Sequence, residues 1–145
     1  MTKKITFGYQ NFPFGGRNIR RPVAQFLIEN DGRKQSFHCL IDSGADESMS
    51  FVEIGKEFGL DFTDAERSYA SGIGGDDTLC FKKHILIHVG NRSIPILVLW
   101  QNRKMDPSKD FPFVIGRLVF FDKFDVIFEQ SKDKFHLKPI PKSRM

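Results

Sequence analysis

The chain has 145 residues, 40% of them hydrophobic, which is the size and composition of a single domain with a core of its own. Its net charge of +4 comes from basic residues that are mostly spread out, so nucleic-acid binding is not expected. Only two cysteines, no recognisable signal peptide and no apolar run of membrane-spanning length predict a cytoplasmic protein without a membrane partner.

A β-hairpin is the first predicted element. Val23 to Glu29 and Gln35 to Ile41 are rich in strand-forming residues, and Asn30-Asp31-Gly32 between them is typical of a tight turn. Three segments are expected along the chain: an N-terminal segment (1–19), one domain (20–139) and a basic C-terminal tail (140–145).

One short helix is predicted over about residues 51–58. Ser50 and Glu53 have the spacing of a capping box, in which a hydroxyl and a carboxylate each bond an amide at the start of a helix. Gly59 stands where such a helix would end. The apolar residues that share one face of this helix are Phe51, Ile54 and Phe58.

The remainder of the chain predicts short strands separated by turns. Ile85, Ile87 and Val89 alternate with other residues, which is typical of a strand with one buried face. A polar loop is expected at 101–110. The expected strands are 67–72, 78–89, 94–100, 124–128 and 134–137. Many short strands and a single helix predict an all-β fold, either a barrel or a sandwich.

The stretch that indicates chemistry begins where the hairpin ends. Asp42 follows an apolar strand and is itself followed by Ser43, Gly44 and Ala45, small residues that allow a tight loop. An ordinary Asp-Ser-Gly turn fits this stretch as well. The motif alone therefore leaves a catalytic and a structural interpretation open.

Three further features favour the catalytic interpretation. Gly72-Ile73-Gly74-Gly75 lies between two predicted strands, where glycines let backbone amides approach an extended peptide. Val114-Ile115-Gly116 is an apolar segment suited to packing behind the Asp42 loop. Arg117 follows it directly and is a natural bidentate partner for Asp46.

Four segments resemble those of the retropepsin-like aspartic proteases, and they occur in the same order. They are similar to the viral Arg-Pro pair that contacts the partner's active-site loop (Arg21-Pro22), the catalytic loop (Asp42-Ser43-Gly44-Ala45), the flap tip (Gly72 to Gly75) and the second conserved segment (Val114 to Arg117). The run from Ile115 to Phe128 is similar to bacterial members of the clan, so the resemblance covers about residues 20–138.

The chain departs from the viral pattern in a few places. Ser43 stands for the Thr of many viral enzymes, and either hydroxyl can make the same hydrogen bond. Leu118 replaces a residue that is usually polar. The expected helix near 51–58 and the loop near 101–110 lengthen the chain beyond the viral minimum.

The resemblance implies an acid-protease barrel and an aspartic endopeptidase that uses no cofactor. Because the chain carries only one such Asp motif, the implied enzyme is a homodimer with its active site on the two-fold axis. One Asp42 would act as general base on a bound water, and its twin, sharing one proton with it, would act as acid. The implied partner is an extended peptide or protein substrate.

The resemblance also implies a role for each residue of the site. Asp42 is the expected catalytic residue, and the expected active-site loop is Ser43, Gly44 and Ala45. The expected substrate-binding residues are Asp46, Glu47, Gly72, Ile73, Gly74 and Gly75. The expected supporting residues are Arg21, Ile115, Gly116 and Arg117.

A non-catalytic protein is the main alternative to an enzyme. The same scaffold could serve as a non-catalytic peptide-binding or dimerisation module, because a fold does not fix a function. A metal site at His84 and His88 is not expected, since residues four apart on a strand lie about 13 Å apart. Cys39 falls inside a predicted strand, where a small buried side chain is expected rather than a nucleophile.

Overall fold

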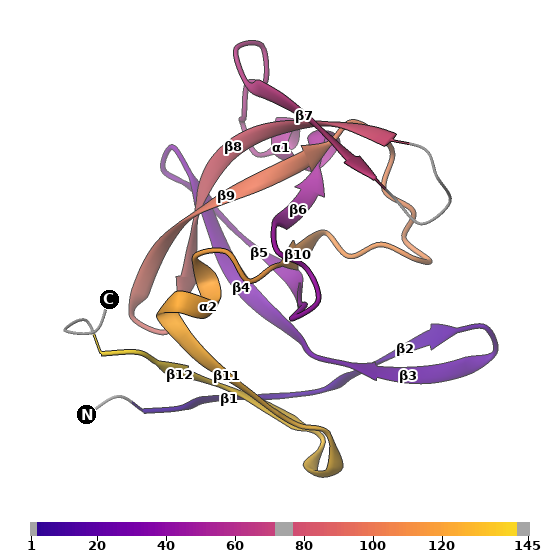
Figure 1. Cartoon of the computed structure of the whole chain (residues 1–145), viewed down its shortest axis with the longest axis vertical. Helices are drawn as coiled ribbons and strands as arrows, with labels where there is room; N and C mark the ends of the chain where they lie inside the picture. Colours follow the sequence, from indigo (N-terminus) through magenta and orange to yellow (C-terminus); the bar gives the residue numbers. More distant parts are fainter. Residues whose placement is uncertain (1–2, 72–76, 142–145) are drawn as a thin grey trace.

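A barrel of six strands forms the centre of the computed structural model, which describes residues 3–71 and 77–141 (Figure 1). The six strands are β4 (Val23–Asn30), β5 (Arg33–Ile41), β6 (Ser48–Phe51), β8 (Asp77–Val89), β9 (Arg92–Gln101) and β10 (Phe113–Ile115). They pair in the order β4-β5-β10-β6-β9-β8, and β8 pairs back onto β4 to close the ring. Beyond the ring, β7 (Glu66–Ser71) pairs along β8. The all-β barrel expected from the sequence is confirmed.

The first predicted hairpin, β4–β5, is confirmed together with its turn. Asn30 pairs with Arg33, so the connection is the two residues Asp31 and Gly32. Both have positive φ, 49° and 81°, which matches the right-handed twist of the two strands. This turn sets the register that brings Ile41 to the end of β5, directly before Asp42.

The predicted helix is present as α1 (Val52–Glu57), but the capping box is wrong. Phe51 is the N-cap residue and no side chain caps the helix. Ser50 lies in the buried strand β6, where its hydroxyl donates to the carbonyl of Pro112 at 2.7 Å. The Glu53 carboxylate instead accepts the amide of Met105 at 2.9 Å. Both side chains thus bond the segment at 102–112, Ser50 from β6 and Glu53 from α1.

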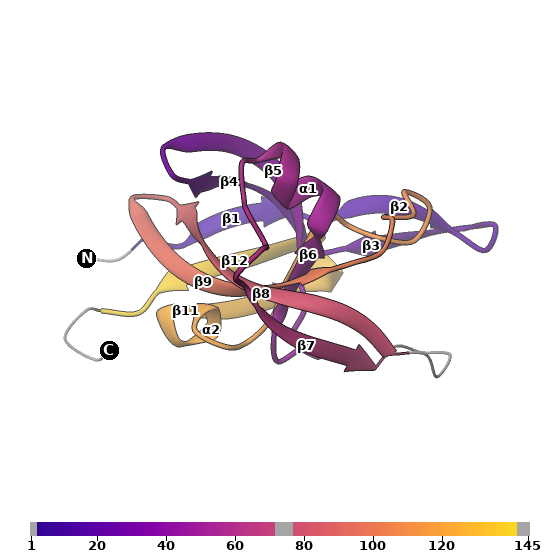
Figure 2. The ribbon, with the colours of Figure 1, turned by 90° about the horizontal axis from the view of Figure 1, so that it is seen from above.

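The N-terminal segment contains three strands that the sequence did not predict. β1 (Ile5–Gly8) joins a three-stranded sheet with β11 (Phe124–Glu129) and β12 (Lys134–Pro139), which form the last predicted hairpin. β2 (Gln10–Phe14) and β3 (Arg17–Arg21) pair only with each other. We call β2–β3 the arm, because it extends away from the barrel (Figures 1 and 2).

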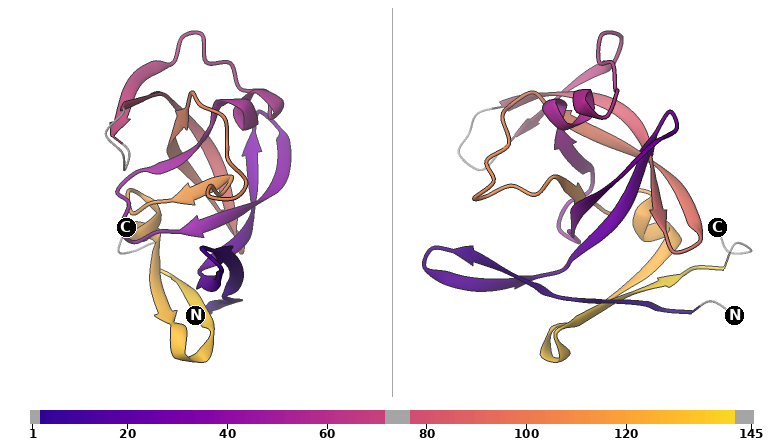
Figure 3. Two further views of the ribbon diagram at one scale, coloured as in Figure 1. Left: turned by 90° about the vertical axis from the view of Figure 1, so that its right-hand side faces the viewer. Right: turned by 180° about the vertical axis from the view of Figure 1, so that it is seen from behind.

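The core is rich in aromatic rings and in aliphatic residues that alternate along the strands. Ile85, Ile87 and Val89 are buried, as their spacing predicted. The fully buried Trp100 packs edge-on against Phe113 and donates its indole N–H to the carbonyl of Lys83 at 3.1 Å. Figure 3 shows the barrel from two further sides, with α1 lying across one end of it. The second short helix, α2 (Phe120–Lys123), follows β10 and was not predicted.

A buried histidine joins the strands of the three-stranded sheet. The His136 side chain, on β12, is 7% exposed. Its Nδ1 lies 2.8 Å from the hydroxyl of Thr6 on β1, and its Nε2 contacts the carboxylate of Glu129 on β11. Lys132 also pairs with Glu129, at 3.2 Å. Both ring nitrogens therefore have partners, which makes this burial acceptable energetically.

Replacing Glu129 with Gln tests this contact through its pH dependence. His136, and then Lys132, hold the pKa of Glu129 below its usual value of 4.5. The carboxylate therefore stabilises the fold above that value, and the stabilisation is lost as the pH falls through the lowered pKa. We expect Glu129→Gln to lower the melting temperature at neutral pH and to match the unmodified chain in acid. Glu57→Gln, on the exposed side of α1, is the control; equal effects of the two variants would contradict the assignment.

Candidate active site

The Asp42 loop, residues 42–47, connects two strands that are not neighbours. β10 lies between them, parallel to β5 through Ile115 opposite Ile41 and antiparallel to β6 through Val114 opposite Met49. The chain must therefore pass over the end of β10 to travel from β5 to β6. This crossing places Asp42 at the rim of the barrel.

Backbone hydrogen bonds fix both sides of the loop to the segment that follows β10. The amide of Asp42 donates to the carbonyl of Ile115 at 3.0 Å. Further along, the amide of Arg117 donates to the carbonyl of Ala45 at 2.8 Å, and that of Leu118 to Asp46, also at 2.8 Å. Because these bonds involve only the main chain, they hold the loop in its conformation without help from its side chains.

Gly116 lies directly beneath the loop, where no side chain fits. A Cβ atom there would lie 2.5 Å from the carbonyl oxygen of Glu47 and 2.9 Å from that of Ala45. The Gly116 amide donates to the hydroxyl of the buried Ser48 at 3.1 Å. Glycine is thus required for close approach of two backbones, as the apolar-apolar-Gly pattern indicated.

The Asp42 carboxylate is half-buried and points back into its own loop. Its Oδ1 accepts the amide of Gly44 at 2.9 Å. A Cβ on Gly44 would lie 3.2 Å from the same oxygen, so a larger residue would crowd the carboxylate. Ser43 and Gly44 are exposed, so this part of the loop faces solvent in the single chain.

Asp42 lines an open cavity of about 830 Å³. Apolar side chains of the barrel form one wall, and the ends of β7 and β8 form another. Arg21 also lines this cavity. Its lining also includes Leu40, Met49, Val114, Ser71 and Thr78. A carboxylate that the loop holds at the edge of such a cavity can act on a molecule bound there.

Asp46 and Arg117 form the ion pair that the sequence indicated, through one contact rather than two. Arg117 Nη2 lies 2.6 Å from Asp46 Oδ1. The two side chains are 57% and 70% exposed, so the pair adds at most about 1 kcal/mol to stability. Glu47, the next residue, is exposed as well. Both carboxylates are therefore accessible to solvent, but neither residue lines the Asp42 cavity.

The four remaining expected residues, Gly72 to Gly75, lie outside the described residues. The strands that lead into and out of this segment form a ladder that ends with Ser71 opposite Asp77. The two side chains share a hydrogen bond of 2.9 Å. Ser71 and Thr78 line the Asp42 cavity, so the end of this hairpin reaches the candidate site.

The sequence predicted a polar loop at 101–110, but not that the segment at 102–112 forms a further wall of the cavity. Arg103 binds Asp110 through two nitrogen–oxygen contacts of 2.9 and 3.0 Å, and its guanidinium lies over the Phe51 ring at 4.9 Å. Phe111 lines the cavity beside them. The polar composition predicted only a loop, and no periodic pattern relates Arg103 to its partner seven residues later.

The histidine and cysteine side chains are not placed to form a metal site or to act as a nucleophile. Within residues 3–71 and 77–141, no group of three His, Cys, Asp or Glu side chains could hold a metal ion. His88 instead contacts Glu29 at 2.8 Å. Cys39 is fully buried, and burial raises the pKa of its thiol to about 12. The thiol is thus neither accessible nor ionised near neutral pH. In the same part of the chain, no helix has the length and apolar character needed to cross a membrane.

Comparison with known proteins identifies the fold. No family model and no curated protein matches the sequence. Among solved structures, a retropepsin-like aspartic protease from Rickettsia conorii matches with a TM-score of 0.63 at 13% identity, covering 96% of this chain and 94% of that one. The EIAV protease complexed with the inhibitor HBY-793 matches with a TM-score of 0.54 at 22% identity, covering 70% and 86%. The chain has a retropepsin-like fold.

The retropepsin-like fold confirms the resemblance that four short segments carried. Structural similarity at these sequence identities establishes the fold but not the activity, which depends on the residues of the site. The bacterial structure matches over nearly the full length of the chain. The expectation of a retropepsin-like barrel was therefore correct, although the strands β1 to β3 escaped it.

Gly116→Ala tests the close approach beneath the Asp42 loop. The new methyl group would meet the Glu47 and Ala45 carbonyls, so we expect the free energy of unfolding to fall by about 1–3 kcal/mol or more. Gly8→Ala is the matched control, because a Cβ there meets nothing within 4 Å. Chemical denaturation of both variants measures the difference. If Gly116→Ala unfolds at the same denaturant concentration as Gly8→Ala, the loop does not rest on Gly116.

Proposed function

We propose that the chain is an aspartic endopeptidase whose active site forms from the Asp42 carboxylates of two copies. The observation that carries this proposal is the Asp42 loop itself. A half-buried carboxylate, bonded by the Gly44 amide, stands at the rim of a large open cavity in a retropepsin-like fold. One carboxylate cannot be base and acid in the same step, and a two-fold axis beside the loop would supply the second.

The proposed mechanism divides the two roles between the two Asp42 side chains. Two carboxylates about 3 Å apart repel each other, so the pair holds one proton between them. The ionised Asp42 removes a proton from a bound water, and the resulting hydroxyl attacks the scissile carbonyl carbon. The protonated Asp42 donates to the carbonyl oxygen. The Asp42 that took the proton from water then gives it to the amide nitrogen, and the other Asp42 regains a proton from the tetrahedral diol as the carbon–nitrogen bond breaks and the amine leaves.

An extended peptide is the substrate that best fits the cavity. β7 ends the sheet, so its outer edge has backbone groups that a peptide strand can pair with. Leu40, Met49 and Val114 offer apolar contacts to substrate side chains. Gly44 and Asp46 are proposed to bind the peptide backbone, with Glu47 as a further substrate contact and Ile73 to Gly75 closing over the peptide as a lid.

Exposed apolar residues next to the Asp42 loop support the proposed homodimer. Leu118 and Val119 are 60% and 37% exposed. Val119 has a φ of 70°, and the amide of Phe120 bonds the carbonyl of Leu118 across it, a conformation that is costly for a β-branched residue. Strain of this kind persists where a surface has a function. Ser43, which is exposed on the Asp42 loop, is proposed to form a hydrogen bond with the Ser43 side chain of the second copy across the two-fold axis.

Asp42→Asn should abolish peptide cleavage. Asn accepts the same Gly44 amide but cannot take a proton from water, so we expect the rate to fall by at least about a thousandfold with the melting temperature unchanged. Mass spectrometry of a peptide pool incubated at pH about 4 to 7 measures cleavage. Asp64→Asn, on an exposed turn before β7, is the control. Equal cleavage by Asp42→Asn and the unmodified chain, or no cleavage by either, would favour a non-catalytic peptide-binding module.

A further inference from the structure

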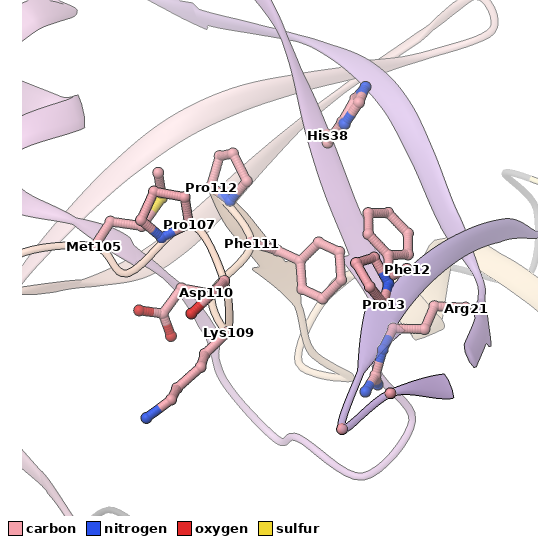
Figure 4. A pocket seen from close by; sticks show the side chains of 13 residues that line it. Phe12, Pro13, Arg21, His38, Met105, Pro107, Lys109, Asp110, Phe111 and Pro112 are labelled. Carbon is pink, nitrogen blue, oxygen red and sulfur yellow. The ribbon is translucent and has the colours of Figure 1, made fainter. Parts of the chain in front are cut away.

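A second cavity, of about 650 Å³, adjoins the Asp42 cavity. It lies between the arm and the loop at 102–112, and we call it the arm–loop pocket (Figure 4). The two cavities share Arg21, Lys109, Asp110 and Phe111 as lining residues. The two cavities therefore lie next to each other, with these four residues at their common boundary.

Contacts across the arm–loop pocket hold its two sides in place. The Phe12 ring, on the arm, meets the Phe111 ring of the loop edge-on, with ring centroids 4.9 Å apart (Figure 4). The loop is braced from within, because the Asp110 carboxylate binds both Arg103 and the amide of Asp106. The pocket is thus formed before any ligand arrives, which lowers the entropic cost of binding.

The lining of the arm–loop pocket combines apolar rings with positive charge. Its apolar residues are Phe12, Pro13, Met105, Pro107, Phe111 and Pro112. Arg21 stands on the arm side and Lys109 on the loop side (Figure 4). Asp110 adds a carboxylate, but the Arg103 guanidinium already neutralises it and holds its pKa below the usual range. The exposed Lys109 therefore offers a positive charge to a ligand.

We propose that the arm–loop pocket binds an aromatic side chain of a peptide that carries a carboxylate on the adjacent residue. The aromatic ring would pack against Phe12 and Phe111, and the carboxylate would face Lys109. The inference rests on the proposed function and names its substrate class: peptides with an acidic–aromatic pair at some distance from the scissile bond. An extended segment spans about 3.3 Å per residue, so a few residues suffice to connect the two cavities.

Peptide binding to the Asp42→Asn chain tests this proposal without cleavage. The probes are fluorescein-labelled, alanine-rich peptides of about eight residues that carry Phe-Glu, Phe-Lys or Ala-Glu at one position. Fluorescence anisotropy should give the tightest binding for Phe-Glu, weaker by about fivefold or more for each of the other two. Similar affinities for all three peptides, or no binding of any, would overturn the proposal.

Substitutions within the pocket assign the effect to it. Lys109→Gln should remove the advantage of Phe-Glu over Phe-Lys, and Lys109→Glu should reverse it. Lys56→Glu changes the net charge equally but lies on the exposed face of α1, so it should keep the original order. If Lys56→Glu and Lys109→Glu change the order alike, the effect is one of net charge and the pocket is not the site.

A second copy of the chain is the rival occupant of the arm–loop pocket. Phe12→Ala separates the two cases when peptide binding and sedimentation are measured together. Weaker binding of the Phe-Glu peptide with unchanged oligomeric state supports the proposal, whereas loss of a dimer with unchanged peptide preference overturns it. Failure of the unmodified chain to cleave peptides would refute the proposed catalysis alone, since the binding assay uses the Asp42→Asn chain.

Discussion

The close approach of two backbones at Gly116 is the constraint on which the candidate site depends. β10 fills the gap between β5 and β6, so the Asp42 loop must cross over it, and only glycine leaves room beneath the Glu47 and Ala45 carbonyls. Main-chain bonds from Asp42 to Ile115 and from Arg117 to Ala45 follow from that crossing. The barrel thus positions one carboxylate at its rim with little help from side chains.

In the proposed enzyme, this geometry supplies one of the two carboxylates that peptide hydrolysis requires. One Asp42 is present in each chain, and the loop around it exposes Ser43 and the strained, apolar turn at Leu118 and Val119. A second copy placed against this surface would add the missing carboxylate and cover the apolar side chains at once. The activity would then depend on protein concentration, because mass action governs the fraction of paired chains.

The parts of the fold that local sequence determines were predictable. Asp31-Gly32 fixed a hairpin, the Ile85, Ile87 and Val89 alternation fixed a buried face, and the short motifs indicated the barrel. β6 was mistaken for a helix cap because its buried residues Ser48 and Ser50 are polar, which reverses the usual pattern. The arm was not predicted, and neither was its packing against the predicted polar loop, because the two meet only in three dimensions, through side chains far apart in the chain such as Phe12 and Phe111.

Subunit mixing tests the central claim, that two Asp42 residues from two chains make one active site. Unmodified protein is held at a concentration where its specific activity has reached a plateau, and the Asp42→Asn chain is added in increasing amounts with time for exchange. A shared site predicts that the activity falls to about one-half at equal amounts and to about one-tenth at a ninefold excess, because mixed dimers hold a single carboxylate. Activity that stays constant at every ratio would show that each chain acts alone and would contradict the account.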